Sequence, residues 1–158
     1  SVFSLGELIK DTVNHLQPNA MSQSVRIETR IEEHYLAADK LKLSQVLINL
    51  ILNALAHSPA NGVITVSGGT HSKGENIYFS VADQGIGIPD EIKKLVLQRG
   101  HTEQMEKGHG LGLDIAFRIA EVHRGTLEIR DNHPRGTIVE IKLPNGLHST
   151  SDGEHGNV

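Results

Sequence analysis

The chain has 158 residues, of which 37% are hydrophobic, a formal net charge of −4 at pH 7 and no cysteine. This length predicts one domain with a sizeable core. The acidic balance disfavours a general nucleic-acid binder, and the lack of cysteine excludes disulfides and thiolate chemistry. No apolar run reaches the roughly 18 residues that span a bilayer. We therefore expect a cytoplasmic chain without direct membrane insertion, with any inner-membrane anchor in a longer parent protein.

Apolar periodicity, caps and breakers predict the secondary structure. Ser4 with Glu7 three residues later is typical of a helix start, and Gln17–Asn19 should end that helix. Asp39 should cap the second helix, and Gly125 should end the last one. In chain order we expect a helix from residue 4 to about 17, strands at 25–31 and 35–38, a helix at 40–57, strands at 63–70 and 77–82, helices at 89–97 and 111–123, and strands at 126–130 and 137–143.

Strands and helices mixed in this way predict one sheet covered by helices on one face. Residues 99–109 have no apolar periodicity and predict a mobile loop. The polar, glycine-rich residues 145–158 predict a disordered tail after a folded domain at 1–144.

Three motifs follow one another along the chain. Asn49 and Asn53 lie four residues apart and therefore project from one side of an otherwise apolar helix. Asp83 follows a predicted strand and begins the segment Asp-Gln-Gly-Ile-Gly. Residues 108–113 read Gly-His-Gly-Leu-Gly-Leu and open another helix. Each motif alone is weak, since an isolated Asp-x-Gly is often only a capped turn, but their order and spacing predict a nucleotide pocket.

The set resembles the catalytic ATP-binding domain of sensor histidine kinases, in the superfamily of gyrase, Hsp90, histidine kinases and MutL. The resemblance covers residues 3 to 144. It rests on an asparagine box at 45–54, glycine boxes at 83–87 and 108–113, and the closing segments 136–139 and 143–144. It implies the Bergerat fold, a two-layer α/β sandwich in which three helices cover one face of a mixed, mostly antiparallel sheet.

Each motif has a chemical role in that pocket. The carboxylate of Asp83 can accept a hydrogen bond from the exocyclic amine of adenine, which discriminates against guanine. Gly85 and Gly87 let the backbone approach a flat base. The second glycine cluster offers helix N–H groups to phosphate oxygens. Asn53 can supply one oxygen to Mg²⁺, which is usually held by few protein groups plus substrate phosphates.

The expected site is larger than these motifs. The residues expected to contact ATP are Asn49, Asn53, His57, Asp83, Gly85, Gly87, Ile88, Lys107, Gly108, His109, Gly110, Leu111, Gly112, Leu113 and Thr137, with Asn53 on the metal. Asn49 and Arg99 are the candidate catalytic residues. The resemblance makes 99–107 the ATP lid, and it places Thr137 with Asp83 in a water network behind adenine.

Asn49 separates the subfamilies. In the ATP-hydrolysing relatives the resemblance places a water-activating glutamate there, and an amide cannot accept a proton at neutral pH. The sequence therefore favours phosphoryl transfer to a protein over hydrolysis. It departs from the histidine kinase pattern at Ala56 and His57, where Lys and Tyr are frequent, and at 95–97, where the phenylalanine box is missing. None of the ten histidines is followed by an acid and proline, as a phosphoacceptor would be.

Our leading hypothesis is a domain that binds Mg²⁺-ATP and delivers the γ-phosphoryl group to a histidine of its own dimerisation domain, which is missing from this chain. That histidine would then supply a response regulator. One alternative is an anti-sigma-factor-type serine kinase of the same superfamily. Another is a degenerate nucleotide-sensing or docking module, which Ala56 favours and the two asparagines disfavour. The histidines lack zinc-ligand spacing, so we set a zinc site aside.

Overall fold

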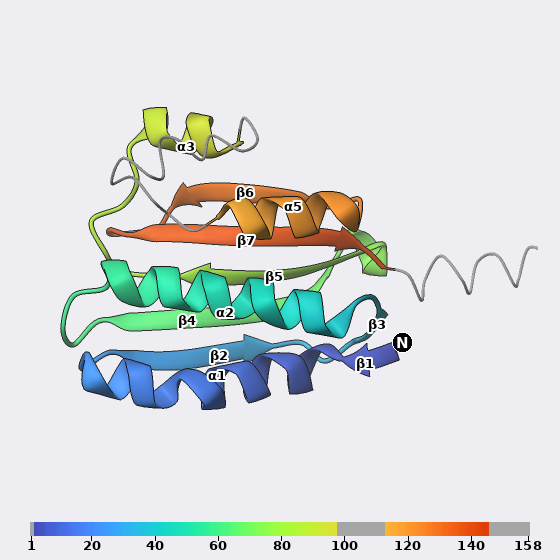
Figure 1. Cartoon of the computed structure of the whole chain (residues 1–158), viewed down its shortest axis with the longest axis horizontal. Coiled ribbons are helices and arrows are strands. Elements are labelled where there is room, and N and C mark those ends of the chain that lie inside the picture. Colours follow the sequence, from blue (N-terminus) through green and yellow to red (C-terminus); the bar gives the residue numbers. More distant parts are fainter. Residues whose placement is uncertain (1, 98–112, 146–158) are drawn as a thin grey trace, which may run out of the picture.

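The computed structural model of the chain describes residues 2–97 and 113–145 (Figure 1). The elements are β1 (Val2–Ser4), α1 (Leu5–Ser22), β2 (Arg26–Ile31), β3 (Tyr35–Ala37), α2 (Lys40–His57), β4 (Val63–His71), a 3-10 turn η1 (Ser72–Gly74), β5 (Asn76–Ala82), α3 (Asp90–Leu97), α5 (Asp114–Val122), β6 (Thr126–Asp131) and β7 (Thr137–Pro144). No helix of these described ranges is long and apolar enough to cross a membrane.

One five-stranded sheet forms the back layer of the domain. Its strand order is β2-β4-β5-β7-β6, with β2 and β4 parallel and every other pair antiparallel. The register pairs Ala82 of β5 with Ile138 of β7, so the residue after β5 lies beside the first residue of β7. Each edge strand carries an Arg–Glu ion pair, Arg26–Glu28 at 3.0 Å on β2 and Arg130–Glu128 at 3.6 Å on β6.

Three helices cover one face of this sheet. Helix α1 lies against β2 and β4, α2 against β4 and β5, and α5 against β6 and β7 (Figure 1). Their apolar sides and the inward side of the sheet form one continuous buried cluster. The predicted fold class, a two-layer sandwich with a mixed, mostly antiparallel sheet and three covering helices, is confirmed.

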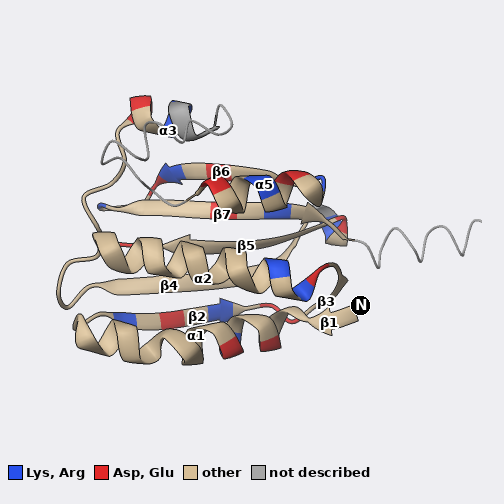
Figure 2. Ribbon diagram, viewed as in Figure 1, with Lys and Arg blue, Asp and Glu red and all other residues tan. Residues whose placement is uncertain are grey.

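Helix α2 has the limits that the sequence predicts. Asp39 Oδ1 accepts a hydrogen bond from the Lys42 amide at 3.2 Å, which caps the first turn. At the other end the Ser58 hydroxyl donates to the Ala54 carbonyl at 2.8 Å, and Pro59 follows. Figure 2 shows that the charged residues of α2 gather at its start, at Lys40 and Lys42. The half of α2 that carries the two asparagines has no Asp, Glu, Lys or Arg, and His57 is its last residue.

Helix α1 begins as predicted and ends later than predicted. The Ser4 hydroxyl accepts a hydrogen bond from the Glu7 amide at 3.0 Å, as the capping pattern requires. The predicted end at 17–19 is wrong, because the helix continues through Pro18 to Ser22. Ala20, beyond the proline, is fully buried, so the helix after Pro18 packs into the core.

Gly125 follows α5 for a different reason from the one that the sequence suggested. The residue in the left-handed conformation is Arg124, with a φ of 60°. The Gly125 amide closes the helix end by donating to the Ala120 carbonyl at 2.7 Å. A Cβ on Gly125 would lie 2.2 Å from the Lys142 carbonyl oxygen of β7. Glycine is required here by the close approach of a strand, not by a positive φ.

Two further details differ from prediction. Strand β1 was not predicted, and it pairs with β3 in a separate two-stranded sheet. Asn145, which was assigned to a disordered tail, is buried with 3% exposure. Its amide donates to the Glu75 carbonyl at 3.0 Å, and its side chain donates to the Gly74 carbonyl at 2.9 Å. These bonds fix Asn145 to the β4–β5 connection, so Asn145 is part of the folded domain.

Candidate functional site

Asp83 lies immediately after β5, beside the start of β7. Its amide donates to the Thr137 carbonyl at 2.9 Å, which extends the strand pairing by one step. Its carboxylate oxygen Oδ1 accepts hydrogen bonds from the Gly85 amide at 2.9 Å and the Thr137 amide at 3.2 Å. No described residue donates to the other oxygen, Oδ2. Asp83 is therefore a carboxylate with one oxygen satisfied by the protein and one available to a ligand.

The environment of Asp83 is unfavourable for a charge. Its exposed fraction is only 5%. Burial raises the pKa of Asp83 above its usual value, and the hydrogen bonds from the Gly85 and Thr137 amides and the charge of His57 offset this only in part. A buried carboxylate that the fold does not fully satisfy costs stability, and such groups are concentrated at functional sites.

The Asp83–Gly87 loop is confined between the end of α2 and the β6–β7 turn. A Cβ on Gly85 would lie 2.3 Å from the His57 carbonyl oxygen, so the loop packs directly against the last residue of α2. Gly87 has a φ of 86°, which favours glycine. On the other side, a Cβ on Gly136 would lie 2.0 Å from the Asp83 carbonyl oxygen. The loop glycines allow three elements to meet at Asp83.

The polar residues of α2 reach the same end of the sheet. Asn49, Asn53 and His57 recur every four residues, and the last of them is close enough for its charge to lower the pKa of Asp83. Both asparagines are half-buried. The Asn53 side chain makes no hydrogen bond to another residue within 2–97 or 113–145. The structure therefore brings the end of α2 to the Asp83 loop, as the motif order predicted.

The remaining predicted residues fall into two groups. Thr137 is buried beside Asp83, and Ile88 packs against the edge of the core. Leu113 is completely buried immediately before α5, so its side chain is part of the core in this structure. The other predicted residues lie outside the described ranges, and their roles stay predictions: Arg99, Lys107, Gly108, His109, Gly110, Leu111 and Gly112.

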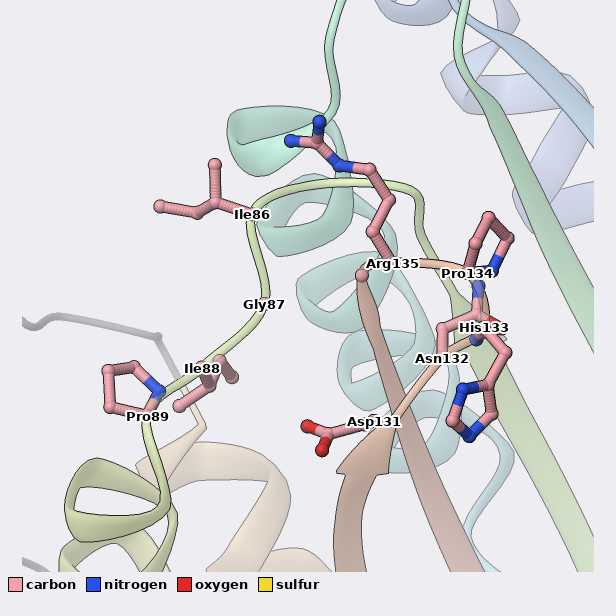
Figure 3. A pocket seen from close by; sticks show the side chains of 10 residues that line it. Ile86, Gly87, Ile88, Pro89, Asp131, Asn132, His133, Pro134 and Arg135 are labelled. Atoms are coloured by element: carbon pink, nitrogen blue, oxygen red, sulfur yellow. Dashed lines mark hydrogen bonds between the residues drawn. The ribbon is translucent and has the colours of Figure 1, made fainter.

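Sequence reasoning missed a pocket beside this loop. Figure 3 shows it between residues 86–89 and the β6–β7 turn at 131–136. The Asn132 side chain donates to the Asp83 carbonyl at 2.7 Å, and Arg135 Nε donates to the Gly85 carbonyl at 3.0 Å. The sequence indicates a turn here, but it carries no signal for contacts between residues that lie about 50 positions apart.

Comparison with known proteins agrees with this geometry. The family model described as "Histidine kinase-, DNA gyrase B-, and HSP90-like ATPase" matches residues 38–147, and the chain belongs to this family. Sporulation kinase C of Bacillus subtilis is 34% identical over 143 residues, covering 89% of this chain and 33% of that protein. Histidine kinase P4 of Formosa agariphila is 39% identical over 124 residues, covering 73% of this chain and 9% of that protein. The chain thus spans a third or less of these curated relatives.

Solved structures give the same result for the fold. The catalytic domain of histidine kinase ThkA superposes with a TM-score of 0.79 at 24% identity, covering 92% of this chain and 96% of that one. ThkA in complex with the response regulator TrrA gives a TM-score of 0.78 at 25% identity, covering 94% of this chain and 42% of that one. Within its family, the chain corresponds to the ATP-binding catalytic domain of histidine kinases, as the motifs predicted.

Proposed function

We propose that this chain is the part of a sensor histidine kinase that binds Mg²⁺-ATP and presents the γ-phosphoryl group to a histidine on a separate dimerisation domain. The observation that carries the proposal is Asp83, a buried carboxylate whose Oδ1 accepts two backbone hydrogen bonds, on a glycine loop that packs against the end of α2. Binding and positioning are the main tasks of such a domain, because phosphoryl transfer needs little covalent chemistry from the protein.

Adenine fits the unsatisfied oxygen of Asp83. The exocyclic amine of adenine can donate to Oδ2 while Oδ1 keeps its two backbone donors. A guanine base would present a carbonyl oxygen to the same carboxylate and leave it unpaired, which is strongly unfavourable in a buried site. Thr137 lies beside Asp83 and is the residue expected to share a water with it. Gly85 and Gly87 keep the approach to the base free of side chains.

Magnesium fits Asn53 and the nucleotide together. A half-buried carboxamide without a protein hydrogen-bond partner in the described ranges has an oxygen available to a hard cation. The phosphates and water would complete the coordination, and the ion would then neutralise phosphate charge. Arg99 and Lys107 are predicted to add positive charge from the lid.

Asn49 favours transfer over hydrolysis. An amide cannot take a proton from water, so position 49 provides no general base for an attacking water. The nucleophile would be the ring nitrogen of the acceptor histidine, which bonds to the γ-phosphorus as the bond to ADP breaks. A response regulator would then receive the phosphoryl group. In support, one structural neighbour is a histidine kinase in complex with a response regulator.

The proposal is tested by calorimetric titration of ATP and GTP into the chain and into Asp83→Asn. We expect ATP to bind with a dissociation constant on the order of micromolar, and GTP to bind at least about tenfold more weakly. Asp83→Asn should lose ATP binding, because the new side-chain NH2 group would face the exocyclic amine of adenine, and both groups are hydrogen-bond donors. Absence of ATP binding by the unmodified chain would overturn the proposal and favour a degenerate docking module.

The metal role is tested separately with Asn53→Ala. We expect Mg²⁺ to strengthen ATP binding to the unmodified chain and to have little effect on the variant, while binding without Mg²⁺ stays similar in both. Gln45→Ala is the matched control, because it removes an exposed carboxamide from the same helix. Equal Mg²⁺ dependence in Asn53→Ala and Gln45→Ala would exclude Asn53 as the ligand.

A further inference from the structure

The β6–β7 turn is bonded to the backbone of the Asp83 loop by two side chains. Asn132 Nδ2 donates to the carbonyl oxygen of Asp83 at 2.7 Å. Arg135 Nε donates to the carbonyl oxygen of Gly85 at 3.0 Å. Figure 3 shows both residues on the turn that faces the loop. These bonds fix the peptide group between Asp83 and Gln84 and the one between Gly85 and Ile86. The two lie on either side of the peptide group whose Gly85 amide donates to the Asp83 side chain.

The turn is rigid enough to act as a support. The backbone amide of Asn132 donates to the Gly136 carbonyl at 3.0 Å. In the side chain, Oδ1 accepts a hydrogen bond from the His133 backbone amide at 2.9 Å, while Nδ2 donates to Asp83. Both ends of the Asn132 side chain are therefore engaged, so its orientation is fixed. The turn is also held by the pairing of β6 with β7, in which Asp131 lies opposite Thr137.

The loop needs this support because its own sequence gives it freedom. Two of its five residues are glycine, and glycine restricts the backbone least. Gln84 adds one more tie, since its Oε1 accepts a hydrogen bond from the Val63 amide at 2.9 Å. Without the bonds from the turn, the carbonyls of Asp83 and Gly85 could rotate, and the direction of the carboxylate would change with them.

We propose that Asn132 and Arg135 are positioning residues for base recognition, holding the loop carbonyls so that Asp83 Oδ2 keeps the direction that selects an amino-substituted purine. Neither residue touches the base in this role; both act through the backbone of Asp83 and Gly85. The inference rests on the proposed function, because it assumes that Asp83 recognises adenine. A hydrogen bond that depends on direction is lost when its support moves by about 1 Å.

The test compares ATP with inosine triphosphate, which carries a carbonyl in place of the adenine amine. Asn132→Asp keeps an acceptor for the His133 amide, removes the donor to Asp83 and adds one negative charge. Arg135→Met keeps an apolar stem and removes the donor to Gly85. His133→Ala is the matched control, because His133 bonds to Asn132 through its backbone amide and lines the same pocket. Dissociation constants for both nucleotides and melting temperatures are measured for each variant.

We expect the preference for ATP over inosine triphosphate to fall about tenfold in Asn132→Asp and in Arg135→Met, and to stay unchanged in His133→Ala. The ratio cancels any general effect of charge on triphosphate binding. A lower melting temperature with an unchanged ratio would overturn the inference, because a merely structural role weakens both nucleotides equally. If the unmodified chain binds ATP without this preference, the inference also fails. If the unmodified chain binds no ATP, the proposed function fails first and the inference with it.

Discussion

Two carboxylates, Glu33 and Asp83, occupy opposite situations in this domain. Glu33 lies at the N-terminal end of α1. Its Oε1 accepts hydrogen bonds from the Gly6 amide at 3.0 Å and the His34 amide at 2.8 Å, and its Oε2 accepts one from the Ser4 hydroxyl at 2.8 Å. Both oxygens are satisfied and the residue is exposed. Asp83 is buried, and within 2–97 and 113–145 hydrogen bonds reach only its Oδ1. The first carboxylate supports the fold, and we propose that the second receives a ligand.

The pKa values of the two groups move in opposite directions for this reason. Hydrogen bonds from the Gly6 amide and the Ser4 hydroxyl hold the pKa of Glu33 below its usual value. Burial raises the pKa of Asp83. A carboxylate whose charge is stabilised by hydrogen bonds contributes to the stability of the fold. A buried carboxylate with a raised pKa reduces that stability, and such groups are concentrated at functional sites. Four predictions test this contrast.

The largest effect is expected for Asp83→Asn. ATP affinity should fall about a hundredfold or more, since the amide turns a donor toward the adenine amine. Stability without ligand should stay the same or rise, because the amide oxygen can still accept from Gly85 and Thr137 without a buried charge. Calorimetry and thermal unfolding without nucleotide measure the two effects. A clear loss of stability would show that the Asp83 charge supports the fold after all.

Gly136→Ala should damage both stability and binding. Its Cβ would lie 2.0 Å from the Asp83 carbonyl oxygen, and the φ of 110° disfavours alanine. We expect a loss of about 2 kcal/mol in unfolding free energy, with weaker ATP binding by the folded fraction. Urea unfolding and ATP titration measure these changes. Gly74→Ala is the control, because its φ is 90° but no atom lies within 4 Å of an added Cβ. Equal losses in both variants would mean that contact with Asp83 adds nothing to backbone strain.

Glu33→Gln should affect stability alone. The neutral side chain accepts more weakly from Gly6 and Ser4 and loses its interaction with the start of α1, which amounts to about 1 kcal/mol. ATP affinity should be unchanged. Urea unfolding at neutral pH tests the first expectation, and the same titration tests the second. Altered ATP affinity would contradict the division of roles between the two carboxylates.

The smallest and most specific effect is pH dependence. The stabilisation by Glu33 should be complete above its ordinary pKa of 4.5 and be lost as pH falls through its lower folded value. For Asp83 the sign is opposite. The destabilisation that its buried charge causes should disappear as pH falls through its raised folded pKa toward the ordinary value of 3.8. Melting temperatures from neutral pH to about 3.5 would show the gap between Glu33→Gln and the unmodified chain closing only in acid. The gap for Asp83→Asn should close at higher pH than that of Glu33.

The sequence predicts the elements whose start and end signals are local. Asp39 and Pro59 bracket α2, and its bounds were predicted correctly. Prediction failed where distant contacts decide. Pro18 does not end α1, and Ala20 beyond it is buried in the core. Gly125 is required because β7, which follows it in the chain, approaches it closely. Each of these contacts depends on tertiary packing that no local pattern records.

The candidate site divides in the same way. Asp83 was found from its motif, since glycines at fixed spacing leave a visible pattern. Asn132 and Arg135 were missed, because their partners lie 49 and 50 positions away in the chain. Glu33 was missed for a similar reason, as its Ser4 partner lies 29 positions away. A motif is visible in a short stretch of sequence, whereas hydrogen bonds between distant segments appear only in the folded structure.

The ion pairs on the outer strands have a consequence for how the protein behaves when concentrated. An open sheet edge offers unpaired backbone groups on which a second molecule can add a strand. Here both edges carry alternating Arg and Glu side chains, Arg26–Glu28 on β2 and Glu128–Arg130 on β6. An incoming strand would have to desolvate these charges. The two ion pairs therefore disfavour the addition of a strand to either edge of the sheet.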